Sequence, residues 1–324
     1  SSLIFALYLR HTYDILITMR SVTREDIASL YVPPQGSHKG QNGRLLIIGG
    51  SHLFHAASLW ALTVASRIVD LVHYSSVPEN NESVQKAKEE FKNGIVVPRK
   101  DVESYIEEDD CILIGPGMTR DNETETLTNT LLKKYPQKQW VIDAGALQMM
   151  DVSLIPKNAI LTPHHGEFES LSLRAKPLAV IARNEVTKQS LLMTSRDKLR
   201  NLNHQGIAAS PAAPRNDTDA VGWFAKEYKC IVLLKGEKDI VSNGKETRVI
   251  EGGNPGMTKG GTGDVLAGLI AALACKNDPF LATIAGSFIN KKAGDALYAR
   301  VGPYFNATDL AGEISVVMKE FLPA

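Results

Sequence analysis

The chain has 324 residues, of which 22% are charged and 44% hydrophobic, and it can build one large α/β domain or two small ones. Lys plus Arg equals Asp plus Glu at 36 each, so the formal net charge is zero. This balance excludes the basic surface typical of nucleic-acid-binding proteins and gives no attraction to a membrane surface. We therefore expect neither nucleic acid nor membrane as a partner.

The first eighteen residues are apolar but are interrupted by Arg10, His11 and Asp14. The stretch is too short and too interrupted for a membrane-spanning helix, and it lacks the pattern of a signal peptide. We treat residues 1–18 as an N-terminal extension of unclear role and expect residues 19–324 to form a single domain.

The three cysteines, Cys111, Cys230 and Cys275, lie far apart and form no Cys-x-x-Cys pair. Cys111 and Cys230 stand in apolar runs, so we expect core thiols in a reducing compartment. This usage predicts a cytoplasmic location.

Apolar, strand-like runs alternate with helical segments along the chain. The expected strands are 44–49, 71–74, 95–97, 111–114, 140–142, 159–161, 231–234, 239–241 and 248–250. The expected helices are 56–69, 123–134, 265–274, 279–301 and 307–321. Continuous apolar strands between helices predict a three-layer α/β/α fold with a mostly parallel central sheet.

Residues 172–217 do not fit this alternation, because they are rich in Arg, Ser, Ala, Asn and Pro and lack a clear period. Structureless loops of this length are uncommon in a compact domain. We expect a surface insertion that is partly helical over 180–201. The alternative is a cap over the active site.

A glycine-rich loop over residues 254–268 carries the strongest functional pattern. It contains Gly256, Gly260, Gly261 and Gly263 and leads directly into an apolar helical run. Glycine lets the backbone approach a phosphate closely, and a helix N-terminus offers unpaired N–H groups and a favourable dipole. An ordinary capped helix start is the alternative, but it does not require four glycines. The loop therefore predicts a phosphate site.

Asp264 follows these glycines in the first turn of the expected helix. Nearby amides stabilise the charged form of a carboxylate, so we expect Asp264 to stay ionised. An ionised carboxylate beside a phosphoryl acceptor can take the proton from an attacking hydroxyl. Asp264 is therefore the candidate base.

His164 directly follows a strand, within the sequence Thr162-Pro163-His164-His165-Gly166-Glu167. Pro163 and Gly166 predict a tight turn that presents His164 at the end of the strand. A lone histidine is often structural, but its position beside Glu167 favours a substrate contact. Two adjacent histidines point in different directions, so a two-histidine metal site is not expected.

Three further loops follow strands: Gly49-Gly50-Ser51, Gly115-Pro116-Gly117 and Lys235-Gly236. Each alone has a plain turn as its alternative, and the first lacks the Rossmann fingerprint. Lys235 suits a nucleotide phosphate, the alternative being a solvated lysine in a hairpin. Together with the helix-entry loop, these turns predict a cleft.

These features, in this order, resemble the ribokinase-like superfamily and, within it, the NAD(P)H-hydrate dehydratase family. The matching segments are Gly50-Ser51 with Ala56, Gly115-Pro116-Gly117, Asp143-Ala144-Gly145-Ala146-Leu147, Thr162-Pro163-His164-x-Gly166-Glu167, Lys235-Gly236, and Asn254-Pro255-Gly256-Met257 through Gly261-Thr262-Gly263-Asp264. The resemblance covers about residues 19–324 apart from the insertion. The last motif alone would indicate only the superfamily.

The resemblance implies a repair enzyme that converts hydrated NADH or NADPH to the dihydronicotinamide form with ADP or ATP and Mg²⁺. In this family the hydroxyl on the reduced ring is phosphorylated and phosphate is then lost. Asp264 would be the base, and the amides of Gly261, Thr262 and Gly263 would form the anion hole.

Matching motif positions imply a set of contacts. The hydrated dinucleotide would contact Ala56, Gly117, His164 and Asp264. The adenine nucleotide would contact Lys235, Gly236, Glu237, Lys238, Asp239 and Gly263. The metal ligands stay open, as do the preferences between ADP and ATP and between NADH and NADPH, and the family resemblance favours a homo-oligomer.

The chain departs from the family pattern at His55, where glycine is usual, and at His165, where proline is usual. The alternative within enzymes is a small-molecule hydroxyl kinase of the thiazole or pyrimidine alcohol type. A nucleotide-binding regulator without turnover is a third possibility. The stretch from Thr162 to Glu167 favours the dehydratase, and Asp264 argues against a regulator, which has no need of a base.

Overall fold

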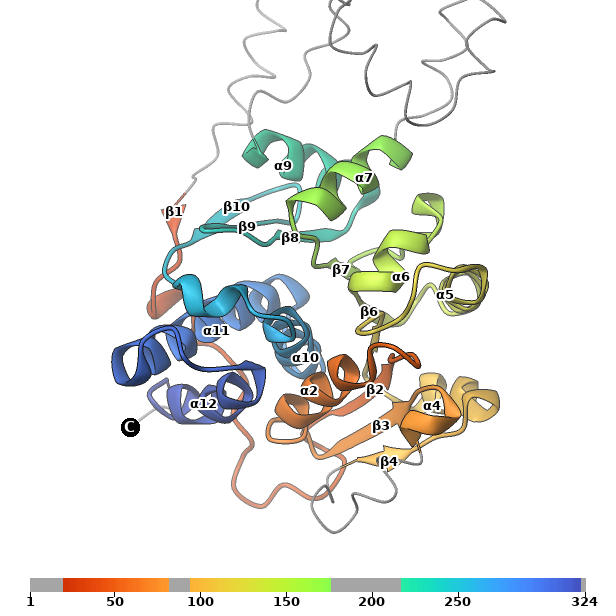
Figure 1. Cartoon of the computed structure of the whole chain (residues 1–324), viewed down its shortest axis with the longest axis horizontal. Helices are drawn as coiled ribbons and strands as arrows, with labels where there is room; N and C mark the ends of the chain where they lie inside the picture. Colours follow the sequence, from red (N-terminus) through yellow and green to blue (C-terminus); the bar gives the residue numbers. More distant parts are fainter. Residues whose placement is uncertain (1–19, 82–93, 176–216, 322–324) are drawn as a thin grey trace, which may run out of the picture.

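The computed structural model describes residues 20–81, 94–175 and 217–321. In these ranges helices pack against both faces of one extended sheet (Figure 1). The N-terminal extension 1–18, the segment 176–216 and the helix expected over 180–201 lie outside the described residues. Within the described ranges, no helix is long and apolar enough to cross a bilayer.

The sheet has ten strands in the order β1-β10-β9-β8-β7-β6-β5-β2-β3-β4. Their bounds are β1 Arg20–Ser21, β2 Arg44–Ile48, β3 Leu71–Ser75, β4 Ile95–Val96, β5 Cys111–Ile114, β6 Gln139–Ile142, β7 Ile160–Leu161, β8 Ile231–Leu234, β9 Asp239–Ser242 and β10 Thr247–Ile250. Strands β8 to β4 are all parallel, whereas β9 runs antiparallel to β8 and to β10. The expected mostly parallel sheet is confirmed.

Two helical layers cover the sheet. One contains α2 His55–Ala65, α10 Thr262–Ala274, α11 Pro279–Val301 and α12 Ala307–Lys319, and the other contains α4 Val102–Glu108, α5 Asn122–Lys134, α6 Ala144–Met149, α7 His165–Ala175 and α9 Asp217–Tyr228. Side chains of β2 alternate between the layers: Leu45 and Ile47 join the first core, and Leu46 and Ile48 the second. The three-layer α/β/α fold is therefore confirmed.

Helices α4, α6, α7 and α9 were not predicted from the sequence. The turn expected over 163–166 is wrong, because α7 begins at His165 and continues to Ala175. The edges of the expected insertion are also helical, since 172–175 complete α7 and Asp217 begins α9. These helices bury short apolar faces against the sheet, and that packing is not visible in a local pattern.

The strand order reverses between β2 and β5. From β2 the chain proceeds through β3 to β4 on one side, and from β5 it proceeds through β6 and β7 on the other. Ligands of such sheets bind beyond the carboxyl ends of the strands at this switch point. The loops after β2 and β5 flank this position, so the topology alone locates a candidate site.

Candidate active site

The loops after β2 and β5 pack directly on each other at the switch point. The Gly50 amide donates to Pro116 O at 2.7 Å. A Cβ on the preceding Gly49 would lie 2.5 Å from Pro116 O, and Gly50 itself has φ +75. Only glycine lets the two loops approach this closely.

Gly117 brings the β5 loop against the start of α2. Its φ is +73, and a Cβ there would lie 2.5 Å from Phe54 O and 3.0 Å from Ala57 Cβ. Ala56 is the residue before Ala57 and the second residue of α2. The structure thus places Gly117 and Ala56, two expected substrate contacts, beside each other.

The glycine-rich loop enters α10 through the 3-10 helix η6, Pro255–Thr258. Thr262 braces the loop, because its hydroxyl donates to Met257 O at 2.7 Å and to Lys259 O at 2.9 Å. The amides of Gly263 and Asp264, by contrast, have no backbone acceptor within the described ranges. The Gly263 N–H is available for an anion at the helix N-terminus, whereas the Asp264 N–H interacts with the carboxylate of its own residue.

Gly261 fixes the direction in which α10 begins. Its φ is +95, and a Cβ there would lie 2.4 Å from the Trp60 ring. Trp60 is itself held by a hydrogen bond from Nε1 to Thr308 Oγ1 at 3.1 Å. Gly260 differs, since nothing lies within 4 Å of its Cβ position. Packing therefore requires a glycine at 261 and not at 260.

The lysine that follows β8 reaches the residue that follows β6 and the start of α10. Lys235 Nζ donates to Asp143 Oδ1 at 3.0 Å, and Thr162 Oγ1 donates to the same oxygen at 2.7 Å. The side chain of Asp143 is 3% exposed and that of Lys235 is 20% exposed. The Cβ position of Gly263 lies 3.6 Å from Lys235 Nζ. Lys235 is therefore not a solvated hairpin lysine; it faces the anion loop.

Asp264 has a pKa raised to about 7. Burial is the largest cause, and repulsion from Asp143 adds to it, while Lys235 and the Asp264 amide act in the opposite direction. The expectation that Asp264 stays fully ionised is therefore wrong, because desolvation outweighs the helix amides. A carboxylate with a pKa near neutrality is well suited to general-base work.

Lys235 keeps its positive charge despite burial. Burial by itself lowers the pKa of Lys235, but Asp143, Glu167 and Asp264 raise it, and the net direction is upward. The ammonium therefore offers a fixed cation next to the free Gly263 amide of α10. That combination matches a phosphate that carries a negative charge.

His164 precedes the first residue of α7 and forms a reciprocal cap with Glu167. The His164 amide donates to Glu167 Oε2 at 2.9 Å, and the Glu167 amide donates to His164 Nδ1 at 3.2 Å. The imidazole is 58% exposed. Since Nδ1 accepts a hydrogen bond, Nε2 carries the proton in the neutral ring. A helix cap thus presents His164 as an exposed side chain, with its Nε2 3.5 Å from Glu167 Oε2.

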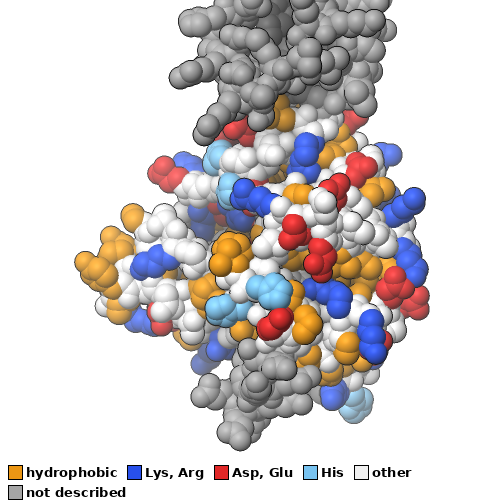
Figure 2. All heavy atoms as spheres, turned by 45° about the vertical axis from the view of Figure 1, so that its right-hand side comes forward, with side chains coloured by type: hydrophobic (Ala, Val, Ile, Leu, Met, Phe, Trp, Pro, Cys, Tyr) orange, Lys and Arg blue, Asp and Glu red, His pale blue; other side chains and the backbone are white. Residues whose placement is uncertain are grey.

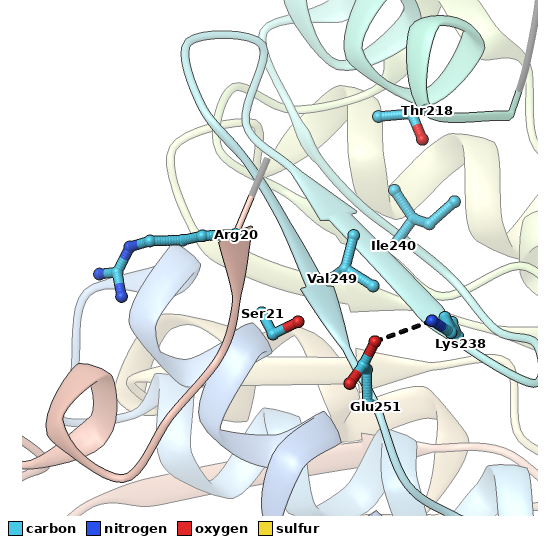
Figure 3. A pocket seen from close by; sticks show the side chains of 7 residues that line it. All are labelled: Arg20, Ser21, Thr218, Lys238, Ile240, Val249 and Glu251. Atoms are coloured by element: carbon cyan, nitrogen blue, oxygen red, sulfur yellow. Dashed lines mark hydrogen bonds and ion pairs between the residues drawn. The ribbon is translucent and has the colours of Figure 1, made fainter. Parts of the chain in front are cut away.

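The other side chains of the expected nucleotide segment are exposed or have partners other than Asp264. Lys238 pairs with Glu251 at 2.8 Å in a surface pocket of about 360 Å³ that Arg20 and Ile240 also line (Figure 3). Glu237 is exposed. Asp239 is buried and accepts from the Gly236 amide at 2.9 Å. Within this segment, Lys235 is therefore the side chain that the structure places beside the anion loop.

Asp143 was assigned no role from the sequence, although it belongs to one of the matching motifs. It directly follows the apolar strand β6, and His164, which drew attention from the sequence, likewise lies in the segment after β7. Ala144, the next residue, has φ +43. A strained non-glycine residue at a strand end is typical of functional sites. The position after β6 was therefore the available indication.

No group of three or more His, Cys, Asp and Glu side chains in the described ranges is arranged to hold a metal ion. Mg²⁺ at phosphoryl-transfer sites needs only one or two carboxylates, because substrate phosphates and water complete its shell. Asp143 and Glu167 flank Lys235 and keep free lone pairs. The residues therefore fit an ion that enters with the nucleotide phosphates.

Acidic and basic side chains are interspersed on the face shown in Figure 2. This distribution agrees with the zero formal net charge of the chain. The charges at the candidate site are thus local: the Lys235 ammonium and the N-terminus of α10 are positive, and Asp143, Glu167 and Asp264 are the acidic groups around them.

Comparison with known proteins gives consistent similarities. A family model described as NAD(P)H-hydrate dehydratase matches residues 45–204 and 207–315. An ADP-dependent (S)-NAD(P)H-hydrate dehydratase of Nitrosopumilus maritimus is 33% identical over 302 residues, covering 88% of this chain and 91% of that protein.

A bifunctional NAD(P)H-hydrate repair enzyme of Methanocaldococcus jannaschii is 33% identical over 305 residues; the match covers 91% of this chain and 52% of that protein. The chain thus spans about half the length of that bifunctional relative. The Bacillus subtilis ADP/ATP-dependent NAD(P)H-hydrate dehydratase, co-crystallized with ATP/Mg²⁺, shares the fold with a TM-score of 0.70 at 19% identity, covering 94% of this chain and all (100%) of that one.

Proposed function

The chain belongs to the NAD(P)H-hydrate dehydratase family, and on this premise we propose that it dehydrates hydrated NADH or NADPH at the expense of ADP, with ATP as the alternative donor. The observation that carries the proposal is Asp264, a partly buried carboxylate with a pKa of about 7 at the N-terminus of α10. It stands beside the free Gly263 amide and the Lys235 ammonium.

In the first step, Asp264 takes the proton from the hydroxyl on the reduced nicotinamide ring. The hydroxyl oxygen attacks the terminal phosphorus of the nucleotide, and the bond between that phosphorus and its leaving phosphate oxygen breaks. The Gly263 amide and Lys235 would stabilise the negative charge on the transferring group, with Gly261 and Thr262 shaping the rest of the anion hole. AMP leaves when ADP is the donor.

In the second step, the ring nitrogen donates its electron pair and expels phosphate, a far better leaving group than hydroxide. The neighbouring ring carbon then loses a proton, which restores the double bond of the dihydronicotinamide. Ala56, Gly117 and His164 would hold the dinucleotide, and the segment from Lys235 to Asp239 would hold the adenine nucleotide. Mg²⁺, when bound, would neutralise phosphate charge near Asp143 and Glu167.

Two broader properties belong to the same proposal. A homo-oligomer is expected from the family resemblance, and sedimentation of the purified chain tests it. A cytoplasmic location is expected because Cys111, Cys230 and Cys275 are free thiols; fractionation of cells that contain the protein tests it.

The decisive experiment incubates the protein with hydrated NADH or NADPH, Mg²⁺ and either ADP or ATP. We expect the dihydronicotinamide absorbance to recover, with one AMP formed per dinucleotide repaired when ADP is present. Asp264→Asn should abolish turnover and keep nucleotide binding, because the change removes the basicity at nearly constant shape. Glu169→Gln, which alters an exposed carboxylate on α7, is the matched control.

Phosphorylation of a thiazole or pyrimidine alcohol without repair of hydrated dinucleotide would replace the proposal with a hydroxyl kinase. Nucleotide binding without turnover of either substrate would indicate a regulator. Full activity of Asp264→Asn would refute the assignment of the base.

A further inference from the structure

Helix α11 presents a row of polar side chains to the loop after β8 and to the segment between β10 and η6. Ser287, Lys291 and Asp295 follow one another at intervals of four residues and therefore share one face of the helix. Ser287 is fully buried and Lys291 is 5% exposed. The proposed chemistry uses none of these three side chains.

The Lys291 ammonium joins two loops that are separate in the sequence. Its Nζ donates to Gly236 O at 3.2 Å and to Glu237 O at 2.9 Å, in the loop after β8. It also donates to Gly252 O at 3.1 Å, in the segment between β10 and η6. An ammonium has three donors, and here all three are used on backbone carbonyls of the two loops.

Asp239 supports the first loop and completes the site around Lys291. Its Oδ1 lies 3.4 Å from Lys291 Nζ and accepts from the Gly236 amide at 2.9 Å. Its Oδ2 accepts from Ser287 Oγ at 2.7 Å. The turn after Lys235 is thus attached to α11 through both its carbonyls and its amide.

Asp295 supports the second loop in the same way. Its two carboxylate oxygens accept from the Gly253 amide at 3.2 Å and from Asn254 Nδ2 at 3.1 Å. Gly252 and Gly253 have φ +102 and +85, and a Cβ on Gly253 would lie 3.3 Å from Lys291 Nζ. The backbone therefore takes a glycine-only conformation to reach α11.

A buried lysine is costly, since its charge must leave water, and a helix that needed only a core would carry an apolar residue here. The contacts explain what this charge does instead. The first loop leads from Lys235, and the second leads through η6 to Gly263 and Asp264. Their separation sets the space between the Lys235 ammonium and the α10 amides, where the nucleotide phosphates would bind.

We propose that Lys291 is a positioning residue that holds the Lys235–Asp239 loop and the Gly252–Asn254 segment at the separation required by the phosphate donor. This inference rests on the proposed function for the identity of the donor. It does not require Lys291 to touch the nucleotide. The role of Lys291 is to support the affinity for the phosphate donor, and Lys291 takes no part in the chemical step.

The test compares Lys291→Met with Lys292→Met. The two lysines are adjacent, but Lys292 is exposed and lies over the Phe288 ring. For Lys291→Met we expect the KM for ADP to rise by at least about tenfold, equivalent to about 1.4 kcal/mol. The KM for hydrated NADH and the kcat at saturating ADP should change by less than about threefold. Lys292→Met should resemble the wild type.

A structural role alone would lower the thermal stability of Lys291→Met and leave its KM for ADP unchanged, and that result would overturn the inference. If Lys291→Met does not fold, Ser287→Ala replaces it, because it removes only the hydroxyl that holds Asp239. A folded Ser287→Ala protein should show a smaller rise in the same KM; no rise would also overturn the inference.

Calorimetric titration with ADP separates this inference from the proposed function. If the wild type does not repair hydrated dinucleotide but Lys291→Met binds ADP more weakly, the proposed reaction fails and the role of Lys291 stands. If the wild type is active and both proteins bind ADP equally, the role of Lys291 fails and the reaction stands.

Discussion

Asp264→Asn should make the folded protein more stable, and the gain should grow with pH. The pKa of Asp264 is 3.8 in an unperturbed chain and about 7 in the folded protein. A raised pKa of an acid means that folding favours its protonated form, so ionisation destabilises the fold. The penalty begins above pH 3.8, increases with pH and is complete above about pH 7.

The magnitude follows from about 1.4 kcal/mol per pKa unit. Between pH 5.5 and pH 8.5, the penalty for ionising Asp264 grows only until the pH reaches the folded-state pKa of about 7. The penalty therefore grows over about 1.5 pH units. The free energy of unfolding of Asp264→Asn, relative to the wild type, should therefore rise by about 2 kcal/mol over this interval. Because asparagine does not titrate, the cost of burying its amide is the same at both pH values and cancels from the difference.

Urea unfolding of the nucleotide-free proteins at pH 5.5 and pH 8.5 gives the required free energies. Glu169→Gln, on the exposed side of α7, should show no such change with pH. An equal advantage of Asp264→Asn at both pH values would refute the raised pKa, and with it the argument that burial outweighs the helix amides.

The value of kcat/KM should fall about tenfold per pH unit below about pH 6, since the base must be ionised. In Lys235→Gln the acidic limb of the pH–rate profile should move to higher pH, because the Lys235 ammonium lowers the pKa of Asp264 in the wild type. An unchanged midpoint in the pH–rate profile of that variant would contradict the assignment. Gly261→Ala should lower the free energy of unfolding by about 1–3 kcal/mol, because its Cβ would lie 2.4 Å from Trp60 at φ +95. Gly260→Ala, with open space around its Cβ, should leave thermal unfolding nearly unchanged, and equal melting temperatures for the two variants would rule out the packing argument.

The described fold could be predicted from the sequence largely because strand and helix periods are local. The apolar runs gave nine of the ten strands, every one from β2 to β10, and the helices α2, α5, α10, α11 and α12, with ends close to those observed. The two-residue strand β1 was missed, because it is too short to carry a period and exists only by pairing with β10. The helices α4, α6, α7 and α9 depend in the same way on packing.

In the candidate site, too, local features could be predicted and long-range contacts could not. Glycines at strand ends and at the start of α10 are local features, so the loops and Asp264 could be identified from the sequence. The partner of Lys235 could not, because Asp143 is 92 residues away in the chain. The cap between His164 and Glu167 was missed for another reason: it needs a helix where Pro163 and Gly166 indicated a turn.

The order of the main elements, the glycine-rich anion loop and the family resemblance could be identified without a structure, because each depends on neighbouring residues. The protonation of Asp264 depends on the assembled fold, since its pKa is set by burial and by the charges of Asp143 and Lys235, which follow β6 and β8. The contacts by which Lys291 of α11 joins two loops from distant parts of the chain likewise depend on the assembled fold. Burial and long-range electrostatics arise only when the sheet and its helical layers are assembled, so no local pattern carries them.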